Sequence, residues 1–195
     1  MEPDASDIAP DLSPEPAVPP AAVSETEVRR KVTAAVAQAL DLDPSAVVPD
    51  ASLEEELGAE SLDFLDLAFM LEREFQVRLP RLNLLQRAEE RYGEGSLIQD
   101  GQVTERGLAL LAERMPEVDP ERLRPGLRVS ELGRLVTAET FVRVVMELLA
   151  HKAGMLASPC AACGGPLQAS VVAPELACSA CGAAVPLPAG DEVLL

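Results

Sequence analysis

Apolar residues recur at helical spacing in three stretches of the chain, and each stretch follows residues that can cap a helix. Ser24 and Glu27 form a capping box, in which each side chain satisfies a free amide, before a predicted helix over 25–40. The same spacing predicts helices over 62–75 and 138–152. The apolar residues expected to share one face of the second helix are Leu62, Leu65, Phe69 and Phe75.

The segment between the first two helices carries turn signals. Residues 41–50 include two prolines and predict a loop. Ser52 and Glu55 then form a second capping box before a single predicted turn over 53–57, which Gly58 ends.

Residues 83–126 are less regular and predict a separate subdomain. A polar, turn-like centre between apolar ends predicts a hairpin over 97–104. Thr104 can cap a helix over about 105–115, and a short helix is predicted over 129–135, before Thr137 and the last long helix.

The two ends of the chain differ in composition from this middle part. Residues 1–23 hold six prolines, five acids and no base, so we expect a disordered acidic tail. Residues 158–195, rich in Cys, Gly and Pro, are expected to form a separate unit after a domain at 24–157. The fold class expected is therefore mainly α, with a small β unit at the C-terminal end.

Charge and composition exclude several classes of protein. Lys and Arg number 16 against 33 Asp and Glu, a net charge of −17, which argues against nucleic-acid and anionic-membrane binders. Aromatic residues make up 3% and Trp is absent, so the core must be aliphatic. The sequence contains no run of about 20 apolar residues, so no membrane-spanning helix is expected. Residues 1–4 lack the pattern of a signal peptide. We therefore expect a cytoplasmic protein.

A serine stands where the second helix is expected to begin. Ser61 follows the turn at Gly58, and a helix N-terminus favours a phosphate ester on such a hydroxyl. An ordinary N-cap is the simpler interpretation of a serine at this place. A catalytic serine is disfavoured, because the flanks are not G-x-S-x-G and the only histidine is the distant His151.

The stretch LEEELGAESLDFLDLAFMLEREF, with the helix before it and Pro80 after it, resembles acyl carrier proteins. Their attachment motif is usually G-x-D-S-L, and Gly58, Glu60, Ser61 and Leu62 stand at the matching positions, with Glu60 in place of the aspartate. The resemblance implies that Ser61 bears 4′-phosphopantetheine. It also implies a right-handed antiparallel four-helix bundle, interrupted here by an insertion at 83–126.

The same resemblance implies a carrier of acyl thioesters rather than an enzyme, for fatty-acid, specialised lipid or polyketide-type biosynthesis. The implied partners are a phosphopantetheinyl transferase and acyl synthases or transferases with basic docking patches. Glu60, Asp63 and Asp66 are the implied partner-binding acids, whereas Arg73 stands where many members have an acid. We expect a monomer. As a hypothesis, Leu62, Leu65 and Phe69 line an interior that accepts part of an alkyl chain; whether the insertion covers that pocket or binds a dedicated synthase stays open.

Four cysteines lie in two C-x-x-C-G pairs, Cys160 with Cys163 and Cys178 with Cys181. Two such pairs supply the four ligands of tetrahedral Zn²⁺, which predicts a structural zinc ribbon. An iron–sulfur cluster stays open as an alternative, because four cysteines serve both metals. Disulfides fit poorly with a cytoplasmic protein, and no βαβ pattern supports a redox pair.

The ribbon's own composition limits what it can bind. Residues 158–195 contain no Lys or Arg, so a docking or stabilising role is expected rather than nucleic-acid binding. Hairpin strands are predicted over 167–172 and 175–178. The rival function is an unmodified interaction adaptor that keeps the carrier fold and uses the ribbon as its docking module.

Overall fold

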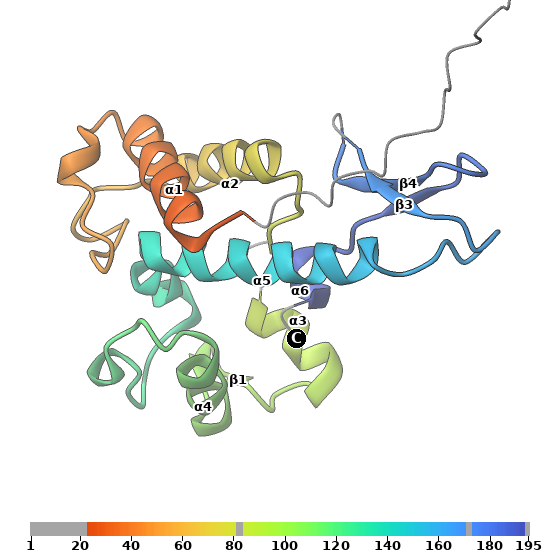
Figure 1. The fold of residues 1–195 in the computed structure, drawn as a ribbon. Coiled ribbons are helices and arrows are strands. Elements are labelled where there is room, and N and C mark those ends of the chain that lie inside the picture. The colour runs from red at the N-terminus through yellow and green to blue at the C-terminus, as the bar shows by residue number, and fades with distance from the viewer. Residues whose placement is uncertain (1–22, 81–83, 171–172, 194–195) are drawn as a thin grey trace, which may run out of the picture.

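The computed structural model describes residues 23–80, 84–170 and 173–193. A helical bundle forms the centre, a second group of helices lies on the other side of α5, and a small sheet lies at one end (Figure 1). The fold is mainly α with a small C-terminal antiparallel sheet, as the sequence predicts. Of the predicted tail, residues 1–22 lie outside the described residues, and Val23 packs against the bundle core.

Three long helices make the bundle: α1 (Glu25–Ala39), α2 (Ser61–Phe75) and α5 (Ala138–Leu156). The Ser24 hydroxyl accepts a hydrogen bond from the Glu27 amide at 3.2 Å, so the predicted cap of α1 is confirmed. α5 extends one turn beyond the predicted end. The loop after α1 contains a short 3₁₀ helix, η1 (Pro44–Ala46), and a longer one, η3 (Val129–Leu135), precedes α5.

The buried face of α2 is not the predicted one. Leu62, Leu65 and Phe69 are exposed by 71%, 62% and 66%, so the predicted interior lined by these three residues is wrong. α2 carries apolar side chains around more than half of its circumference, and packing against α1 selects the other set. The α2 residues in the core are Phe64, Leu67, Leu71 and Phe75.

The second predicted cap forms with a different partner. The Ser52 hydroxyl accepts from the Glu55 amide at 3.1 Å, but the carboxylate that accepts from the Ser52 amide, at 2.7 Å, belongs to Glu56. Ser52 is fully buried and pairs with Thr137 in an isolated antiparallel bridge. This bridge joins the approach to α2 with the start of α5.

The insertion has a small core of its own. It contains α3 (Leu84–Tyr92), the hairpin β1 (Ile98–Gln99) and β2 (Gln102–Val103), α4 (Glu105–Arg114) and η2 (Pro120–Arg122). The predicted hairpin and the Thr104 cap of α4 are confirmed. α3 was not predicted from the sequence. The buried residues of this second core are Leu85, Ala88, Leu97, Val103, Leu108 and Leu111.

A three-stranded antiparallel sheet follows α5. It consists of β3 (Leu167–Ala169), β4 (Glu175–Cys178) and β5 (Ala184–Pro186), with β4 in the middle. The first two strands fall within the predicted hairpin; the third was not predicted. Of the predicted strand over 167–172, residues 171–172 lie outside the described residues.

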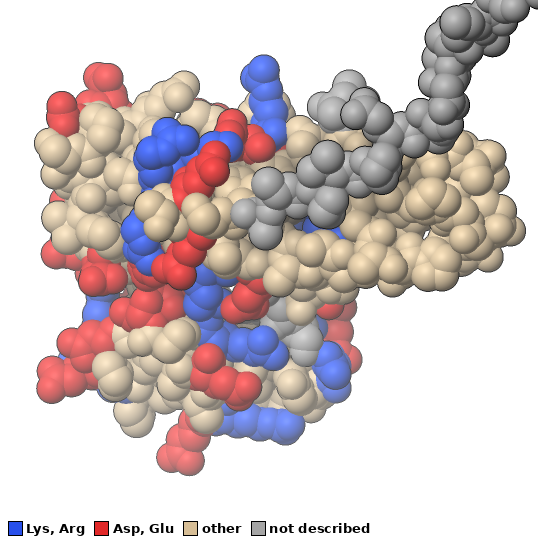
Figure 2. Space-filling view, in the orientation of Figure 1, with Lys and Arg blue, Asp and Glu red and all other residues tan. Residues whose placement is uncertain are grey.

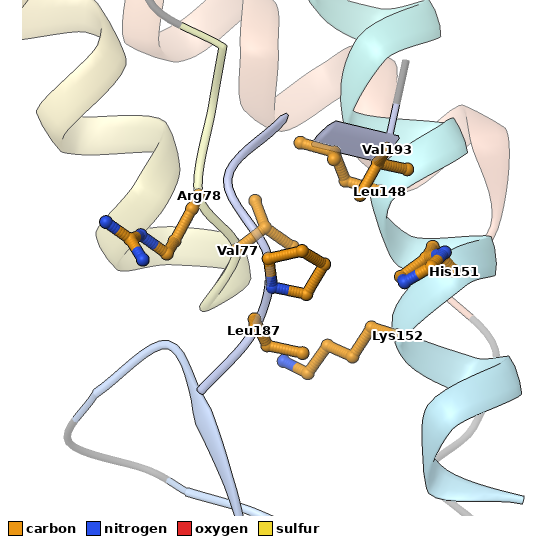
Figure 3. A pocket seen from close by; sticks show the side chains of 8 residues that line it. Val77, Arg78, Leu148, His151, Lys152, Leu187 and Val193 are labelled. Carbon is orange, nitrogen blue, oxygen red and sulfur yellow. The ribbon is translucent and has the colours of Figure 1, made fainter. Parts of the chain in front are cut away.

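The segment after β5 returns to the bundle through a short helix, α6 (Gly190–Val193). Figure 3 shows Leu187 and Val193 of this segment beside Leu148 and Lys152 of α5. A Cβ atom on Gly190 would lie 2.4 Å from the Pro80 nitrogen and 2.8 Å from the Arg78 carbonyl oxygen, so only glycine permits this approach.

Lys152 ties α5 to the end of α2. Its Nζ donates to the carbonyl oxygens of Phe75 and Gln76, at 3.3 and 3.0 Å. These are carbonyls that the end of a helix leaves without an intrahelical partner. Desolvation by burial lowers the pKa of Lys152 from its ordinary value. With this contact at one end and the Ser52 bridge at the other, α2 and α5 run in the same direction (Figure 1).

The corrected face of α2 yields a stability prediction. Leu71→Ala removes a side chain that is 0% exposed and should lower the free energy of unfolding by about 2–5 kcal/mol. Leu62→Ala, on the same helix but 71% exposed, should change it by less than about 0.5 kcal/mol. Urea unfolding followed by circular dichroism measures both. Equal losses in the two variants would contradict the assignment of the faces.

Candidate functional site

Ser61 is the first residue of α2, and its side chain is exposed. The N-cap is Glu60, so the simpler interpretation of Ser61 as the capping residue is wrong. Gly58 has φ +76°, a left-handed conformation that lets the chain turn just before the helix. The Ser61 hydroxyl makes no hydrogen bond to the described residues, and it is therefore free to be modified.

The helix N-terminus next to this hydroxyl is only partly neutralised. The Asp63 carboxylate turns back and accepts a hydrogen bond from the Glu60 amide at 2.7 Å. Asp63 therefore helps to begin its own helix and is less exposed than Glu60 or Asp66. The remaining amides and the helix dipole favour a phosphate ester at Ser61.

Several acids near Ser61 are paired within the molecule. Arg122 of the insertion contacts Glu55 at 2.5 Å, and Arg134 lies 3.5 Å from Glu54 and 3.8 Å from Glu55. Acidic and basic side chains accordingly alternate over the bundle and the insertion in Figure 2.

Two of the predicted partner-binding acids remain available. Glu60 and Asp66 are exposed, and among the described residues neither side chain has an ion-pair partner. Glu60 directly precedes Ser61, and Asp66 follows it on α2. Asp63, the third predicted acid, is occupied in part by its capping bond.

A mainly apolar cleft of about 640 Å³ opens beside α2. Leu65 and Phe69 line it from α2, Phe141 from α5, and Leu111 and Met115 from the insertion. Sequence reasoning missed this cleft, because its walls come from segments that are far apart in the chain. Leu65 and Phe69, which were expected to line an interior, line a surface cleft instead, and Leu62 does not line it.

The charged residues of the cleft are paired, with one exception. The Arg143 guanidinium contacts Glu117 at 3.2 Å and Glu147 at 3.1 Å. Glu72 accepts a hydrogen bond from the Leu79 amide at 2.8 Å. Arg114, at the end of α4, has a buried Nε atom with no hydrogen-bond partner among the described residues.

The four predicted zinc ligands meet at the base of the sheet. All four Sγ atoms lie within 4.8 Å of one another. Cys160 Sγ lies 3.9 Å from Cys181 Sγ, and Cys163 Sγ lies 3.5 Å from Cys178 Sγ. Four ligands at about 2.3 Å from a tetrahedral zinc would lie about 3.8 Å apart. The cluster thus has the size of a Cys₄ metal site, and all four cysteines are free thiols.

Two turns of the same kind present these thiols. Gly164 and Gly182 each have φ +73°, and their amides donate to the carbonyls of Cys160 and Cys178, at 2.7 and 2.9 Å. Glycine follows each C-x-x-C pair because this left-handed conformation is strained for other residues. Gly165 is also required, because a Cβ there would lie 2.7 Å from the Ala180 Cβ and 3.2 Å from the Cys178 Sγ.

The thiols influence each other's ionisation. Hydrogen bonding by the Cys181 amide lowers the pKa of Cys178 to about 6. The hydrogen bond from the Gly165 amide lowers the pKa of Cys163. Hydrogen bonds between Cys163 and the other three thiols outweigh this effect and raise its pKa to about 12. Four thiolates at this spacing repel one another, so complete deprotonation requires a bound cation. The donor set therefore fits Zn²⁺ or another thiophilic metal.

His151 lies far from Ser61. It is exposed on α5, next to Lys152, which contacts the last residues of α2. Ser61 begins α2, whose length at about 1.5 Å per residue is about 21 Å. The two side chains therefore cannot form a Ser–His pair.

Within the described residues, no helix combines the length and apolarity needed to cross a membrane.

Comparison with known proteins bears on the region around Ser61. Residues 30–89 match the family described as phosphopantetheine attachment site. An acyl carrier protein of Thermosynechococcus vestitus is 47% identical over 58 residues, covering 30% of this chain and 72% of that protein. The acyl carrier protein AcpXL of Rhizobium etli is 34% identical over 50 residues, covering 26% of this chain and 54% of that protein. No solved structure matches the chain.

The close packing at Gly165 yields a test of the metal site. We expect the purified protein to hold one zinc per chain. Gly165→Ala should weaken zinc binding by about tenfold or more, because the added Cβ would press on Ala180 and on the Cys178 Sγ and displace the amide that donates to Cys163 Sγ. Gly154→Ala is the matched control: it lies in α5 with nothing within 4 Å of the added Cβ and should leave zinc binding unchanged. Elemental analysis and titration with a competing chelator measure both. Stoichiometric iron, or no metal at all, would contradict the zinc assignment.

Proposed function

The chain belongs to the acyl carrier protein family, and we propose on that basis that it carries acyl groups on 4′-phosphopantetheine attached to Ser61. The acyl groups would be held for fatty-acid, specialised lipid or polyketide-type biosynthesis. The observation that supports the proposal most is the placement of Ser61: its hydroxyl is exposed, has no partner among the described residues and stands at the N-terminus of α2. When attached, the prosthetic group supplies a thiol that holds an acyl group as a thioester.

The residues around Ser61 have separable roles in this proposal. Gly58 turns the chain so that the hydroxyl projects from the helix end. The α2 amides stabilise the negative charge of the phosphate ester. Glu60 and Asp66 attract the basic docking patches of a phosphopantetheinyl transferase and of acyl synthases or transferases.

The remaining features complete the proposal. Arg122 of the insertion and Arg134 of η3 hold the loop before Ser61 through ion pairs with Glu55 and Glu54. The cysteine cluster holds a structural Zn²⁺, because four protein thiols leave no open position for chemistry at a tetrahedral metal. We place the protein in the cytoplasm, as a monomer.

Attachment at Ser61 can be tested by intact mass. Incubation with coenzyme A, Mg²⁺ and a broad-specificity phosphopantetheinyl transferase should add one phosphopantetheine to the protein and none to Ser61→Ala. Ser45→Ala, at another exposed serine, should be modified like the unaltered protein. Failure of several transferases to modify the folded protein would favour the unmodified adaptor.

The acids near Ser61 give a second test. Asp66→Lys should slow modification by about tenfold at low salt, because it replaces an attractive charge with a repulsive one at the docking surface. The difference should shrink as salt is added, since exposed charges are screened. Glu113→Lys, an exposed change of equal charge on α4, is the control and should have little effect. Equal slowing by both changes would show that only net charge matters.

A further inference from the structure

A run of acids stands just before the proposed attachment site. Residues 54–56 are three consecutive glutamates, which we call the turn acids. The Ala59 amide donates to the Leu53 carbonyl oxygen at 2.7 Å, which closes a turn over these glutamates and holds them next to the segment that leads to Ser61. By position and charge, such a run would attract a basic partner that approaches Ser61.

Each of the turn acids is nevertheless held within the molecule. Glu56 accepts a hydrogen bond from the Ser52 amide at 2.7 Å. Glu55 accepts from Nη2 of Arg122 at 2.5 Å, and the same nitrogen donates to the Arg134 carbonyl oxygen at 2.9 Å. Because Nη2 carries two hydrogens, both of its donors are used, and the guanidinium is fixed against the turn.

Glu54 occupies a place that η3 provides. The Arg134 Nε atom lies 3.5 Å from the Glu54 carboxylate and 3.8 Å from that of Glu55. A Cβ atom on Gly133 would lie 2.7 Å from Glu54 Oε2, so the missing side chain makes room for this carboxylate. Glu55 and its partner Arg122 are 67 positions apart, so it is the tertiary fold that engages the turn acids.

The acids of α2 are left out of this network. Glu60 and Asp66 are exposed, and among the described residues neither has an ion-pair partner. At about 1.5 Å per residue they lie about 9 Å apart along the helix. A basic group placed over the turn would instead meet Arg122 and Arg134, and would have to displace a like charge to reach a carboxylate.

We infer that Arg122 and Arg134 determine which partners this carrier accepts, because they withdraw the turn acids and direct basic partners to α2. The inference rests on the proposed attachment at Ser61. The partner that fits carries basic groups about 9 Å apart, for Glu60 and Asp66, and no basic group over the turn. A partner whose basic patch extends over the turn is disfavoured by the two arginines.

Chemical labelling of carboxylates measures the withdrawal directly. Carbodiimide coupling of glycine ethyl ester to the folded protein, read by peptide mass spectrometry, should label Glu60 and Asp66 faster than the turn acids. Gly133→Ala should speed the labelling of Glu54 by about twofold or more, since the added Cβ displaces its carboxylate without changing the net charge. Gly154→Ala, with nothing within 4 Å of the added Cβ, is the matched control and should leave every rate unchanged.

Modification kinetics measure the effect on a partner, with a broad-specificity phosphopantetheinyl transferase as the basic probe. Arg122→Gln with Arg134→Gln should raise kcat/KM about two- to fivefold at low salt, because it frees the turn acids. Arg106→Gln with Arg124→Gln removes the same charge from two exposed arginines of the insertion and should change kcat/KM by less than about 1.5-fold. Glu55→Gln should have little effect alone but should remove most of the gain in the first pair.

The outcomes separate this inference from the proposed function. Turn acids that label as fast as Glu60 in the unaltered protein would overturn the withdrawal. An equal gain in both arginine pairs would show that only net charge matters, and slower modification after loss of Arg122 and Arg134 would assign them to the positioning of Ser61 rather than to partner choice. Absence of modification in the unaltered protein would count against the proposed function, whereas the labelling decides independently whether the turn acids are withdrawn.

Discussion

The burial of one face of α1 between α2 and α5 is the interaction on which the rest of the molecule depends. Val28, Val32 and Val36 are fully buried in this layer. Because the layer takes up the Phe64 and Leu71 face of α2, the other apolar face of that helix must point outward. The exposed serine, the acids beside it and the floor of the cleft are all positioned by this one choice of face.

The insertion and the segment after the ribbon are held against the bundle by different interactions. The insertion contacts the loop before α2 through the ion pair of Arg122 with Glu55, which is partly exposed and therefore screened by salt. The segment after the ribbon is held by close packing, with Leu187 4% exposed and Gly190 against Pro80. The first contact lies near Ser61, whereas the second fixes the far end of α2.

Local signals in the sequence were sufficient for much of the fold. Ser24 and Thr104 are caps whose partners lie three residues away, and the C-x-x-C-G pairs define the whole metal cluster by spacing alone. The buried face of α2 could not be predicted, because both faces are apolar and only the position of α1 decides between them. The cleft beside α2 was likewise hidden, because only the tertiary fold brings the segments of its walls together.

The domain boundaries expected at 24–157 and 158–195 remain a prediction. The last described residues, which end at Val193, lie against the bundle. Val193 packs against the bundle core, and α6 contacts α5. A metal site at the ribbon is thereby connected through the backbone to the helix that carries the cleft.

The pairing of Arg29 with Glu139 joins residues 110 positions apart, on α1 and α5. During synthesis Ser61, α1 and α2 leave the ribosome long before α5 does. Until α5 has been synthesised, the apolar face of α1 lacks one of the two helices that bury it, and the bundle around Ser61 is incomplete. The independent core of the insertion shortens the loop that must close between these helices. Folding of this chain is therefore expected to begin in the insertion and to reach the bundle later. The surface around Ser61 is then among the last parts to become ordered.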